Sequence, residues 1–263
     1  KQLYDKDLLY KGYAVQPYSP VAGTGLSTHE LNLPGCYKNI TDTSLTAQFY
    51  LKREEKSASF FDTDDEYVCF LAWTTTPWTL PANCALAVGN KITYVKIKTY
   101  NRYTFLPISI IMAKDLVHAF FSKEQEDAAL GSYSAGDKLI PYELGAEYLG
   151  EELVGLYYEQ LMPYVQPEGD AFRVIPGDFV STEDGTGIVH TASVFGSDDF
   201  RVCKQHNVPS IMVKDEEGND MPLVDKQGRF VKEVSDFAGK YVKSQYEDQE
   251  LVDASDYKST DVL

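Results

Sequence analysis

Residues 73–83 read Trp73-Thr74-Thr75-Thr76-Pro77-Trp78-Thr79-Leu80-Pro81-Ala82-Asn83. They follow the apolar segment Tyr67 to Ala72, which predicts a buried strand, so the four threonines stand where a strand ends and the chain must turn. Binding residues are often placed at such points. The two prolines stiffen the turn, while the hydroxyl and amide groups can donate and accept hydrogen bonds. The stretch therefore predicts either a binding edge for a small polar ligand or a proline-rich turn whose hydroxyls bond to their own backbone.

A second polar block follows another predicted strand. Gly187 to Ala192 is expected to form that strand, and Gly196 permits a sharp turn after it. Ser197 then suits the N-cap of a helix that runs to about residue 205. Asp198 and Asp199 fall in the first turn of this helix, where acids ordinarily stabilise the helix dipole by ~0.3–1 kcal/mol. That ordinary role is sufficient to account for Asp198.

Both blocks resemble motifs of one enzyme family. Residues 73–83 resemble the threonine-rich motif of the editing domain that is inserted into isoleucyl-tRNA synthetases. The leucyl and valyl enzymes carry an Arg-Pro-acid version of this segment, whereas Thr76-Pro77-Trp78 stands in its place here. Gly185 to Phe200 resembles the family's other editing motif, and the two blocks follow in the same order. The resemblance extends from about Tyr10 to the end of the sequence.

The resemblance implies a site for an amino acid carried as an ester. In the family, the acid corresponding to Asp199 holds the α-ammonium of the bound amino acid, and a charge-assisted bond is a sound way to recognise an aminoacyl group. His190, buried and neutral, is implied to line the pocket and to help set its size. Thr74 and Thr75 are implied to act with these two in hydrolysis. The residues expected to bind the substrate are Trp73, Thr76, Thr79, Asn83, Gly187 and Asp198.

The reaction implied by the resemblance is hydrolysis of the ester that joins valine to isoleucine tRNA. An apolar pocket gains only about 1–3 kcal/mol from one methylene, and the weak rejection of valine by isoleucyl synthesis sites is the standard example of this limit. A second pocket that admits valine and excludes isoleucine removes the remaining errors. No serine or cysteine with a histidine partner is visible near the motifs, so we expect water to attack while Thr74, Thr75, Thr76 and Asn83 hold the adenosine and acyl group.

The cysteines predict no metal in this domain. They show no C-x-x-C spacing, so neither a zinc site nor a disulfide framework is expected from Cys36, Cys69, Cys84 and Cys203. Many relatives carry a pair of metal-binding cysteines in the entry segment, where this chain has Ser19, Val21 and Ala22. We therefore expect no cofactor here, whereas the full-length synthetase implied by the resemblance would use ATP and Mg²⁺.

The chain is strongly acidic. Its 24 Lys and Arg against 40 Asp and Glu give a formal charge of -16, so alone it should repel phosphates and bind tRNA poorly. By resemblance, its partners are the valine-charged 3′ end of tRNA(Ile) and the remaining domains of the same synthetase chain, and we expect a monomer. No apolar run approaches the ~20 residues that span a bilayer and no signal peptide is visible, so a cytoplasmic location without membrane contact is expected.

Short strands separated by turns dominate the sequence. We expect an α+β fold with a β-rich, barrel-like core of short mixed strands and a few flanking helices. With 263 residues and 43% hydrophobic content, the chain can bury a sizeable core. Residues 1–60 are expected to form the entry segment and linking strands, 61–236 the editing core, and 237–263 the return to the catalytic body. Strands are expected at 92–98, 105–112, 172–180, 208–213, 221–224 and 229–231, and a helix at 113–122.

Two other functional classes remain open. A catalytically silent insertion that only positions tRNA or contacts other domains would suit the acidity, and it requires only that the two motif blocks do not converge. A serine-type esterase would need a nucleophile elbow, and no Gly-x-Ser-x-Gly is present. The acidic tract Asp62 to Glu66 lacks the Gly and Glu of an EF-hand loop, so we expect a solvated hairpin turn there.

Overall fold

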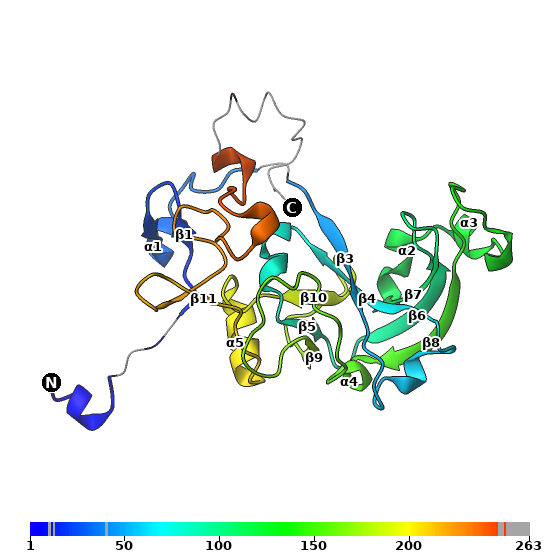
Figure 1. The fold of residues 1–263 in the computed structure, drawn as a ribbon, viewed down its shortest axis with the longest axis horizontal. Coiled ribbons are helices and arrows are strands. Elements are labelled where there is room, and N and C mark those ends of the chain that lie inside the picture. The colour runs from blue at the N-terminus through cyan, green and yellow to red at the C-terminus, as the bar shows by residue number, and fades with distance from the viewer. Residues whose placement is uncertain (10–11, 13, 40–41, 247–249, 251–263) are drawn as a thin grey trace.

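The structure is a computed structural model that describes residues 1–9, 12, 14–39, 42–246 and 250. It has an α+β fold, as expected, in which the strands of the described residues form four separate sheets (Figure 1). The strands are β1 (Tyr18–Ser19), β2 (Thr24–Gly25), β3 (Leu45–Tyr50), β4 (Val68–Thr74), β5 (Ala85–Val88), β6 (Thr93–Tyr100), β7 (Pro107–Ala113), β8 (Glu143–Leu149), β9 (Arg173–Pro176), β10 (Ile188–Thr191), β11 (Val213–Lys214) and β12 (Asp220–Met221). The α-helices are α1 (Thr28–Leu31), α2 (Val117–Phe120), α3 (Lys123–Glu126), α4 (Gly150–Leu153) and α5 (Ser197–Gln205).

The largest sheet has five strands in the order β3-β4-β7-β6-β8. The apolar run before the threonines forms β4, which pairs antiparallel with β3 and parallel with β7. Phe70 of β4 stands opposite Ile111 of β7, and both side chains are fully buried. The buried strand predicted at Tyr67 to Ala72 is therefore confirmed, with the observed strand two residues further on at its end.

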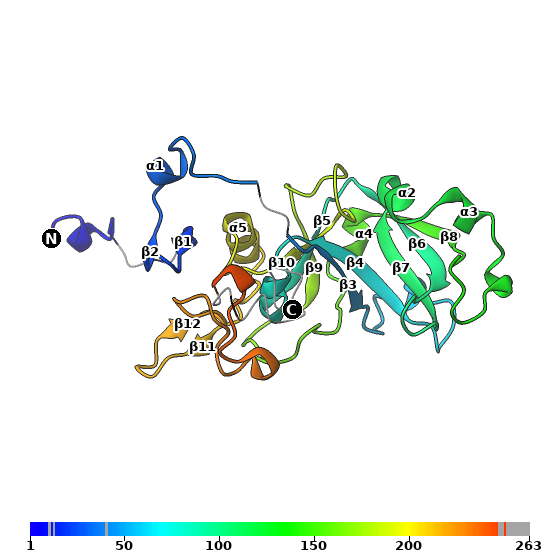
Figure 2. The same ribbon diagram turned by 90° about the horizontal axis from the view of Figure 1, so that it is seen from above.

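A smaller sheet, in the order β10-β5-β9, lies beside the large one (Figure 2). Its central strand β5 is completely buried, pairing antiparallel with β10 and parallel with β9. The threonine stretch connects the two sheets, because β4 ends at Thr74 and a 3₁₀ helix, Pro77–Ala82, leads into β5. The polar stretch thus occupies the crossing between the sheets.

Hydrogen bonds join the two sheets to one another at several separate points. The hydroxyl of Thr186, one turn before β10, donates to the carbonyl of Leu71 in β4 over 2.6 Å, and the amide of Ala113 donates to the Thr186 carbonyl over 2.8 Å. The hydroxyl of Tyr94 donates to the carbonyl of Gly187 over 2.7 Å. A further link is the segment 155–159, which bridges Leu51, just after β3, and Arg173 of β9 through its backbone. Among the described residues none of these links extends into a continuous ladder, so the sheets stay open. The expected barrel-like closure is therefore corrected to open sheets packed side by side.

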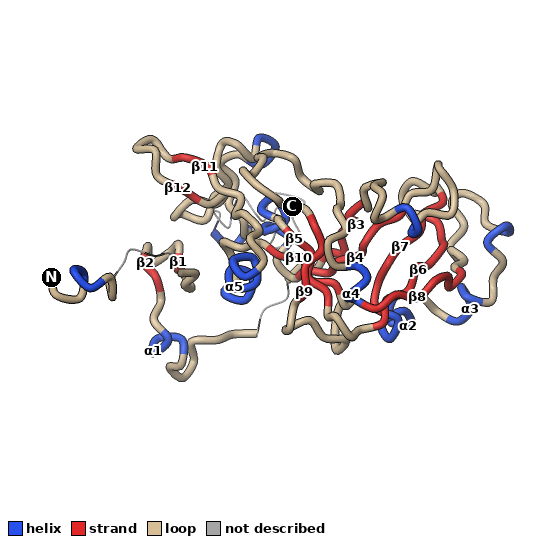
Figure 3. The backbone as a smooth tube through the Cα atoms, turned by 90° about the horizontal axis from the view of Figure 1, so that it is seen from below, coloured by secondary structure: helices blue, strands red, loops and turns tan. Residues whose placement is uncertain are grey.

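Helices are short and lie at the margins of the sheets, as Figure 3 shows, while loops make up much of the rest. The helix expected at 113–122 is a 3₁₀ helix, Lys114–Leu116, that passes into α2. The strands expected at 208–213, 221–224 and 229–231 are wrong in extent, since the described residues form the two-residue pair β11 and β12 and isolated bridges at Val224–Phe230 and Arg229–Tyr241 there. Pro209 and Pro222 shorten the first two, because proline has no amide hydrogen to donate to a strand partner. The end of the expected return segment 237–263 lies outside the described residues.

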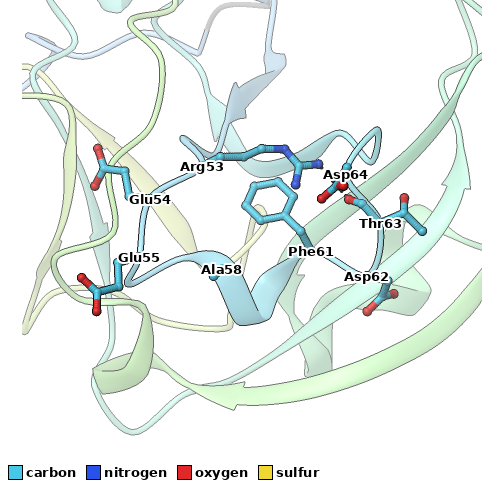
Figure 4. A pocket seen from close by; sticks show the side chains of 8 residues that line it. All are labelled: Arg53, Glu54, Glu55, Ala58, Phe61, Asp62, Thr63 and Asp64. Carbon is cyan, nitrogen blue, oxygen red and sulfur yellow. Dashed lines mark hydrogen bonds between the residues drawn. The ribbon is translucent and has the colours of Figure 1, made fainter.

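The acidic tract forms a turn beside a hollow of about 500 Å³ (Figure 4). The guanidinium of Arg53 lies 3.9 Å from the ring centre of Phe61 and donates to the carbonyls of Thr63 and Glu66 over 3.0 and 2.6 Å. Arg53 is therefore engaged in holding the turn in place. The hollow is lined by Arg53, Glu54, Glu55, Ala58, Phe61, Asp62, Thr63 and Asp64, none of which belongs to either motif block.

The Thr186 bond between the sheets yields a stability prediction. In Thr186→Val the hydroxyl is lost, the buried Leu71 carbonyl loses its donor, and the free energy of unfolding should fall by about 1–2 kcal/mol. Thr186→Ser is the matched control, because it keeps the hydroxyl and loses a methyl group. Urea unfolding should rank the valine variant below the serine variant. The reverse ranking would mean that packing, and not this hydrogen bond, joins the sheets at this point.

Candidate functional site

The two motif blocks line one cavity of about 400 Å³. They meet because β10 pairs with β5, so that His190 stands opposite Leu86 and Thr191 opposite Ala85, directly after the threonine stretch. The first block contributes Trp73, Thr74, Thr75, Thr76 and Thr79. The second contributes residues 185–190, Ala192, Phe195, Gly196 and Asp199. A segment before it completes the wall with Phe179, Ser181 and Asp184.

The threonines divide into bonded and open side chains. The buried Thr74 hydroxyl accepts from the amide of Thr76 over 3.0 Å and lies 3.4 Å from the Thr76 hydroxyl. The Thr79 hydroxyl donates to the carbonyl of Thr76 over 2.8 Å. Thr75 and Thr76 are exposed at the cavity. The hydroxyls of Thr74 and Thr79 therefore brace the turn, while Thr75 and Thr76 lie at the cavity.

The ring of His190 has a protein partner on each nitrogen. Its Nε2 lies 2.8 Å from the Thr79 hydroxyl, and its Nδ1 lies 2.9 Å from the side-chain nitrogen of Asn83. The Thr79 proton is given to a carbonyl, so the hydroxyl oxygen accepts from Nε2. The Asn83 nitrogen is a donor, so Nδ1 is the acceptor. His190 is therefore held as the neutral tautomer that carries its proton on Nε2.

Burial lowers the pKa of His190 to about 4. The imidazole is therefore uncharged at neutral pH, and neither nitrogen is available to take a proton from water. The ring itself remains as a wall of the cavity. His190 can shape the site and keep it free of positive charge, and it is poorly suited to act as a general base.

Asp199 is the acidic group at the start of α5 that faces the cavity. Its carboxylate accepts from the amide of Ala192 over 2.8 Å, and no ion pair to it occurs among the described residues. Burial raises the pKa of Asp199, because the charged form has lost water. A β-carbon at Gly196 would lie 2.9 Å from the carboxyl carbon, so glycine at that position leaves room for the acid. Gly196, not Ser197 as expected, is the N-cap residue of α5.

Asp198 lies on the other side of the helix start. Its carboxylate is 3.3 Å from the guanidinium of Arg201, which also pairs with Asp178 over 2.7 Å. The side chain is 63% exposed and is not part of the cavity lining. Its surroundings suit the helix-start role and an exposed ion pair, which contributes little to stability.

Asn83 lies behind the cavity wall and not on it. Its side chain is buried, donates to the carbonyl of Ala85 over 2.9 Å, and accepts from the hydroxyl of Tyr158 over 2.7 Å. The side-chain amide of Asn83 is thus fixed by Ala85 and Tyr158, and it orients the ring of His190. Gly187 is on the wall, with a φ of +72° and no room for a β-carbon, which would lie 2.4 Å from that of Ala113.

Several lining residues were not predicted from the sequence. Phe195 packs edge-on against Trp78 with ring centres 4.9 Å apart, and Asp184 precedes the second block directly. Both could have been suspected from their proximity to the motifs. Phe179 and Ser181 carry no local signal, because only the folded chain brings their segment to the cavity.

The described part of the chain shows neither a metal-binding cluster nor a membrane-spanning helix. Within residues 1–9, 12, 14–39, 42–246 and 250, no three His, Cys, Asp or Glu side chains are grouped so that they could hold a metal ion. None of the helices in the described part of the chain has the length and apolar character needed to cross a bilayer.

The buried histidine predicts a pH-dependent stability. The unfolded chain takes up a proton at residue 190 near pH 6.5, whereas the folded chain does so only near pH 4, so stability is full above 6.5 and declines as the pH falls towards 4. The contribution of this histidine to the decline should be about 2–3 kcal/mol. Urea unfolding at pH 7 and pH 4.5 should show a smaller decline in His190→Gln than in the parent. Equal declines would show that His190 is not buried in the neutral form.

Sequence comparison finds isoleucine–tRNA ligases. The chain is 61% identical over 246 residues to the ligase of Cytophaga hutchinsonii, covering 94% of this chain and 22% of that protein. The ligase of Bacteroides fragilis is 49% identical over 263 residues, covering 94% of this chain and 23% of that protein. The ligase of Clostridium tetani is 40% identical over 258 residues, covering 98% of this chain and 20% of that protein. No protein-family model matches the chain.

Among solved structures, the cytosolic leucyl-tRNA synthetase editing domain of P. knowlesi aligns with 67% of this chain and 72% of its own, at 13% identity. With a TM-score of 0.45, this likeness is too slight to carry an argument. The sequence relatives decide the family, and the chain spans only about a fifth of their length. The chain belongs to the isoleucine–tRNA ligase family and corresponds to a segment of such a ligase.

Proposed function

We propose that this chain is the editing domain of an isoleucyl-tRNA synthetase and hydrolyses the ester of valine mischarged onto tRNA(Ile). The observation that carries the proposal is the convergence of both motif blocks on one cavity, with the carboxylate of Asp199 on its wall. A catalytically silent insertion would need no such convergence. The names of the sequence relatives support the choice of isoleucine over other amino acids.

The ammonium of the bound amino acid is the natural partner of Asp199. The carboxylate is largely buried, its raised pKa shows that its charge is costly there, and no described side chain neutralises it. An incoming ammonium would relieve this cost through a charge-assisted hydrogen bond. A free amino group is present on every aminoacyl ester, so Asp199 selects the class of substrate and leaves the choice of side chain to the wall.

The choice between valine and isoleucine is a matter of size. The ring of His190 is fixed by two hydrogen bonds. The backbone amide and carbonyl of Thr76 are held by the hydroxyls of Thr74 and Thr79, so the backbone that carries Thr76 cannot move back easily from an added methylene. An overfilled site costs about 1–3 kcal/mol in strain. A rigid wall can therefore exclude isoleucine and still accept valine.

Water is the proposed nucleophile. Thr75 and Thr76 line the cavity, and their hydroxyls are proposed to hold the ester and the attacking water. The bond from the Thr76 amide to the Thr74 hydroxyl fixes the backbone between them. A serine-type mechanism is disfavoured, because Ser181 on the wall would need a histidine base and both nitrogens of His190 are engaged. In this scheme the protein contributes chiefly positioning and electrostatic stabilisation.

The remaining parts of the ligase are proposed to hold the tRNA. A charge of -16 disfavours phosphate binding by this chain alone, so only the terminal adenosine and its amino acid need to enter the cavity. The ATP and Mg²⁺ used in charging isoleucine would act outside this segment.

The two neighbouring acids provide a matched test. In the full-length ligase, Asp199→Ala should lower hydrolysis of valyl-tRNA(Ile) by roughly 30- to 1,000-fold, or ~2–4 kcal/mol, because the ammonium loses its partner. Asp199→Asn should lose nearly as much and should be at least as stable at pH 7, since the buried charge is gone. Asp198→Ala should keep hydrolysis and weaken the helix start by a few tenths to ~1 kcal/mol.

Single-turnover hydrolysis measures the effect of each substitution on editing, and thermal unfolding of the same preparations measures its effect on stability. Charging of tRNA with isoleucine is the control for the rest of the enzyme. An Asp199→Ala ligase that hydrolyses at the parental rate contradicts the assignment. So does an Asp198→Ala ligase that is the more damaged of the two.

The size sieve has its own test. Thr76→Ala or His190→Ala should enlarge the cavity and admit isoleucine, so that the full-length ligase hydrolyses its correct product, isoleucyl-tRNA(Ile). The measurement is the ratio of hydrolysis rates for valyl and isoleucyl esters, which should fall towards one. If the ratio is unchanged in both variants, neither side chain takes part in the sieve.

A further inference from the structure

Tyr158 is a buried residue outside both motif blocks whose hydroxyl reaches the back of the site. Its ring is fully buried and packs edge-on against Phe49, with ring centres 5.3 Å apart. Its amide donates to the carbonyl of Phe172 over 2.9 Å, which fixes the backbone. From this position the hydroxyl donates to the side-chain oxygen of Asn83 over 2.7 Å. Tyr158 is thus rigidly held with its only polar side-chain atom on Asn83.

A series of hydrogen bonds runs from Tyr158 through Asn83 to His190 on the cavity wall. It allows one placement of the protons on these side chains. Asn83 uses both amide hydrogens, one on the carbonyl of Ala85 and one on Nδ1 of His190. Its oxygen is filled by Tyr158, and the far nitrogen of His190 is filled by Thr79. If the amide of Asn83 were flipped, its oxygen would face the Ala85 carbonyl oxygen, and two hydrogen-bond acceptors without a proton between them repel each other. Every polar atom in the series is therefore satisfied in one orientation.

We propose that Tyr158 is a positioning residue that fixes the tautomer of His190 through Asn83. The inference rests on the proposed function in one respect: the cavity that His190 lines is taken to be the hydrolytic site. Tyr158 is not among the residues that line the cavity. It acts together with the carbonyl of Ala85: the hydroxyl donates to the oxygen of Asn83 and the carbonyl takes one amide hydrogen, so the other amide hydrogen stays on Nδ1 of His190.

This orientation matters because it disfavours a charged imidazole. A donor against Nδ1 blocks protonation there, whereas an amide oxygen would accept a proton from Nδ1 and stabilise the cation. A cationic His190 on the same cavity wall would compete with the substrate ammonium for Asp199. Tyr158 therefore keeps the Asp199 carboxylate free for the ammonium of the substrate.

The test compares Tyr158→Phe with Tyr142→Phe. Tyr142 is also buried, packs against another aromatic ring, Phe121, and donates from its hydroxyl to Glu126, but it lies away from the cavity. Nuclear magnetic resonance of the chain labelled with ¹⁵N-histidine should show His190 in the parent with a protonated Nε2 and a bare Nδ1. In Tyr158→Phe the two signals should move towards each other, and in Tyr142→Phe they should stay in place.

Hydrolysis is measured in parallel on the full-length ligase carrying the same substitutions. Tyr158→Phe should slow single-turnover hydrolysis of valyl-tRNA(Ile) about tenfold, as expected when a buried acceptor loses its donor, while Tyr142→Phe should not. The proposal is overturned if His190 in the parent carries its proton on Nδ1, a result that needs no variant to fold. Unchanged His190 signals in Tyr158→Phe, or equal slowing by both variants, also overturn it. A parent ligase that does not hydrolyse the ester refutes the proposed function, and the His190 signals then decide the positioning role alone.

Discussion

The pairing of β10 with β5 is the constraint on which the site depends. These strands are about a hundred residues apart, yet their register sets His190 opposite Leu86 and brings the start of α5 to the end of the threonine stretch. The hydroxyl of Thr186 then ties the turn before β10 to β4. The segment that leads from β4 to β5 is therefore held against β10 at both of its ends. A shift of one residue in this register would turn the His190 side chain to the other face of the sheet. The cavity is therefore a product of sheet topology, lined by residues that the chain order keeps far apart.

Burial shifts the pKa values of His190 and Asp199, the two cavity side chains whose charge loses water, in opposite directions. It lowers the pKa of His190 and raises the pKa of Asp199, and in both cases the cause is loss of water around the charged form. For His190 the outcome is a stable neutral ring, because its nitrogens are satisfied by Thr79 and Asn83. For Asp199 the outcome is a charge that lacks a compensating cation in the described structure. A site with one costly negative charge and a rigid neutral wall is well suited to a small amino acid with a free ammonium group.

The sequence predicts the parts of this site that local patterns encode. The apolar run before Trp73 predicts β4, the turn at Gly196 predicts the helix that carries Asp199, and two adjacent acids at a helix start suggest different roles. Local patterns do not encode which strands pair, so they could not place Asn83 behind His190 or bring Phe179 to the wall. They also missed β8, an exposed edge strand rich in glutamate, and overestimated the strands around Pro209 and Pro222. The role of Tyr158 could not be predicted from the sequence, because nothing in its local sequence distinguishes it from the other tyrosines among the 19 or indicates its contact with Asn83.

We propose that this cavity holds a valyl ester with its ammonium on Asp199. A crystal structure of the protein with a nonhydrolysable valyl-adenosine analogue tests it most directly. The account predicts the analogue in the cavity between the two motif blocks, its ammonium nitrogen about 2.7–3.2 Å from the Asp199 carboxylate and its side chain against His190. An analogue bound in the hollow beside Arg53, or bound in the cavity with its ammonium turned away from Asp199, would contradict it.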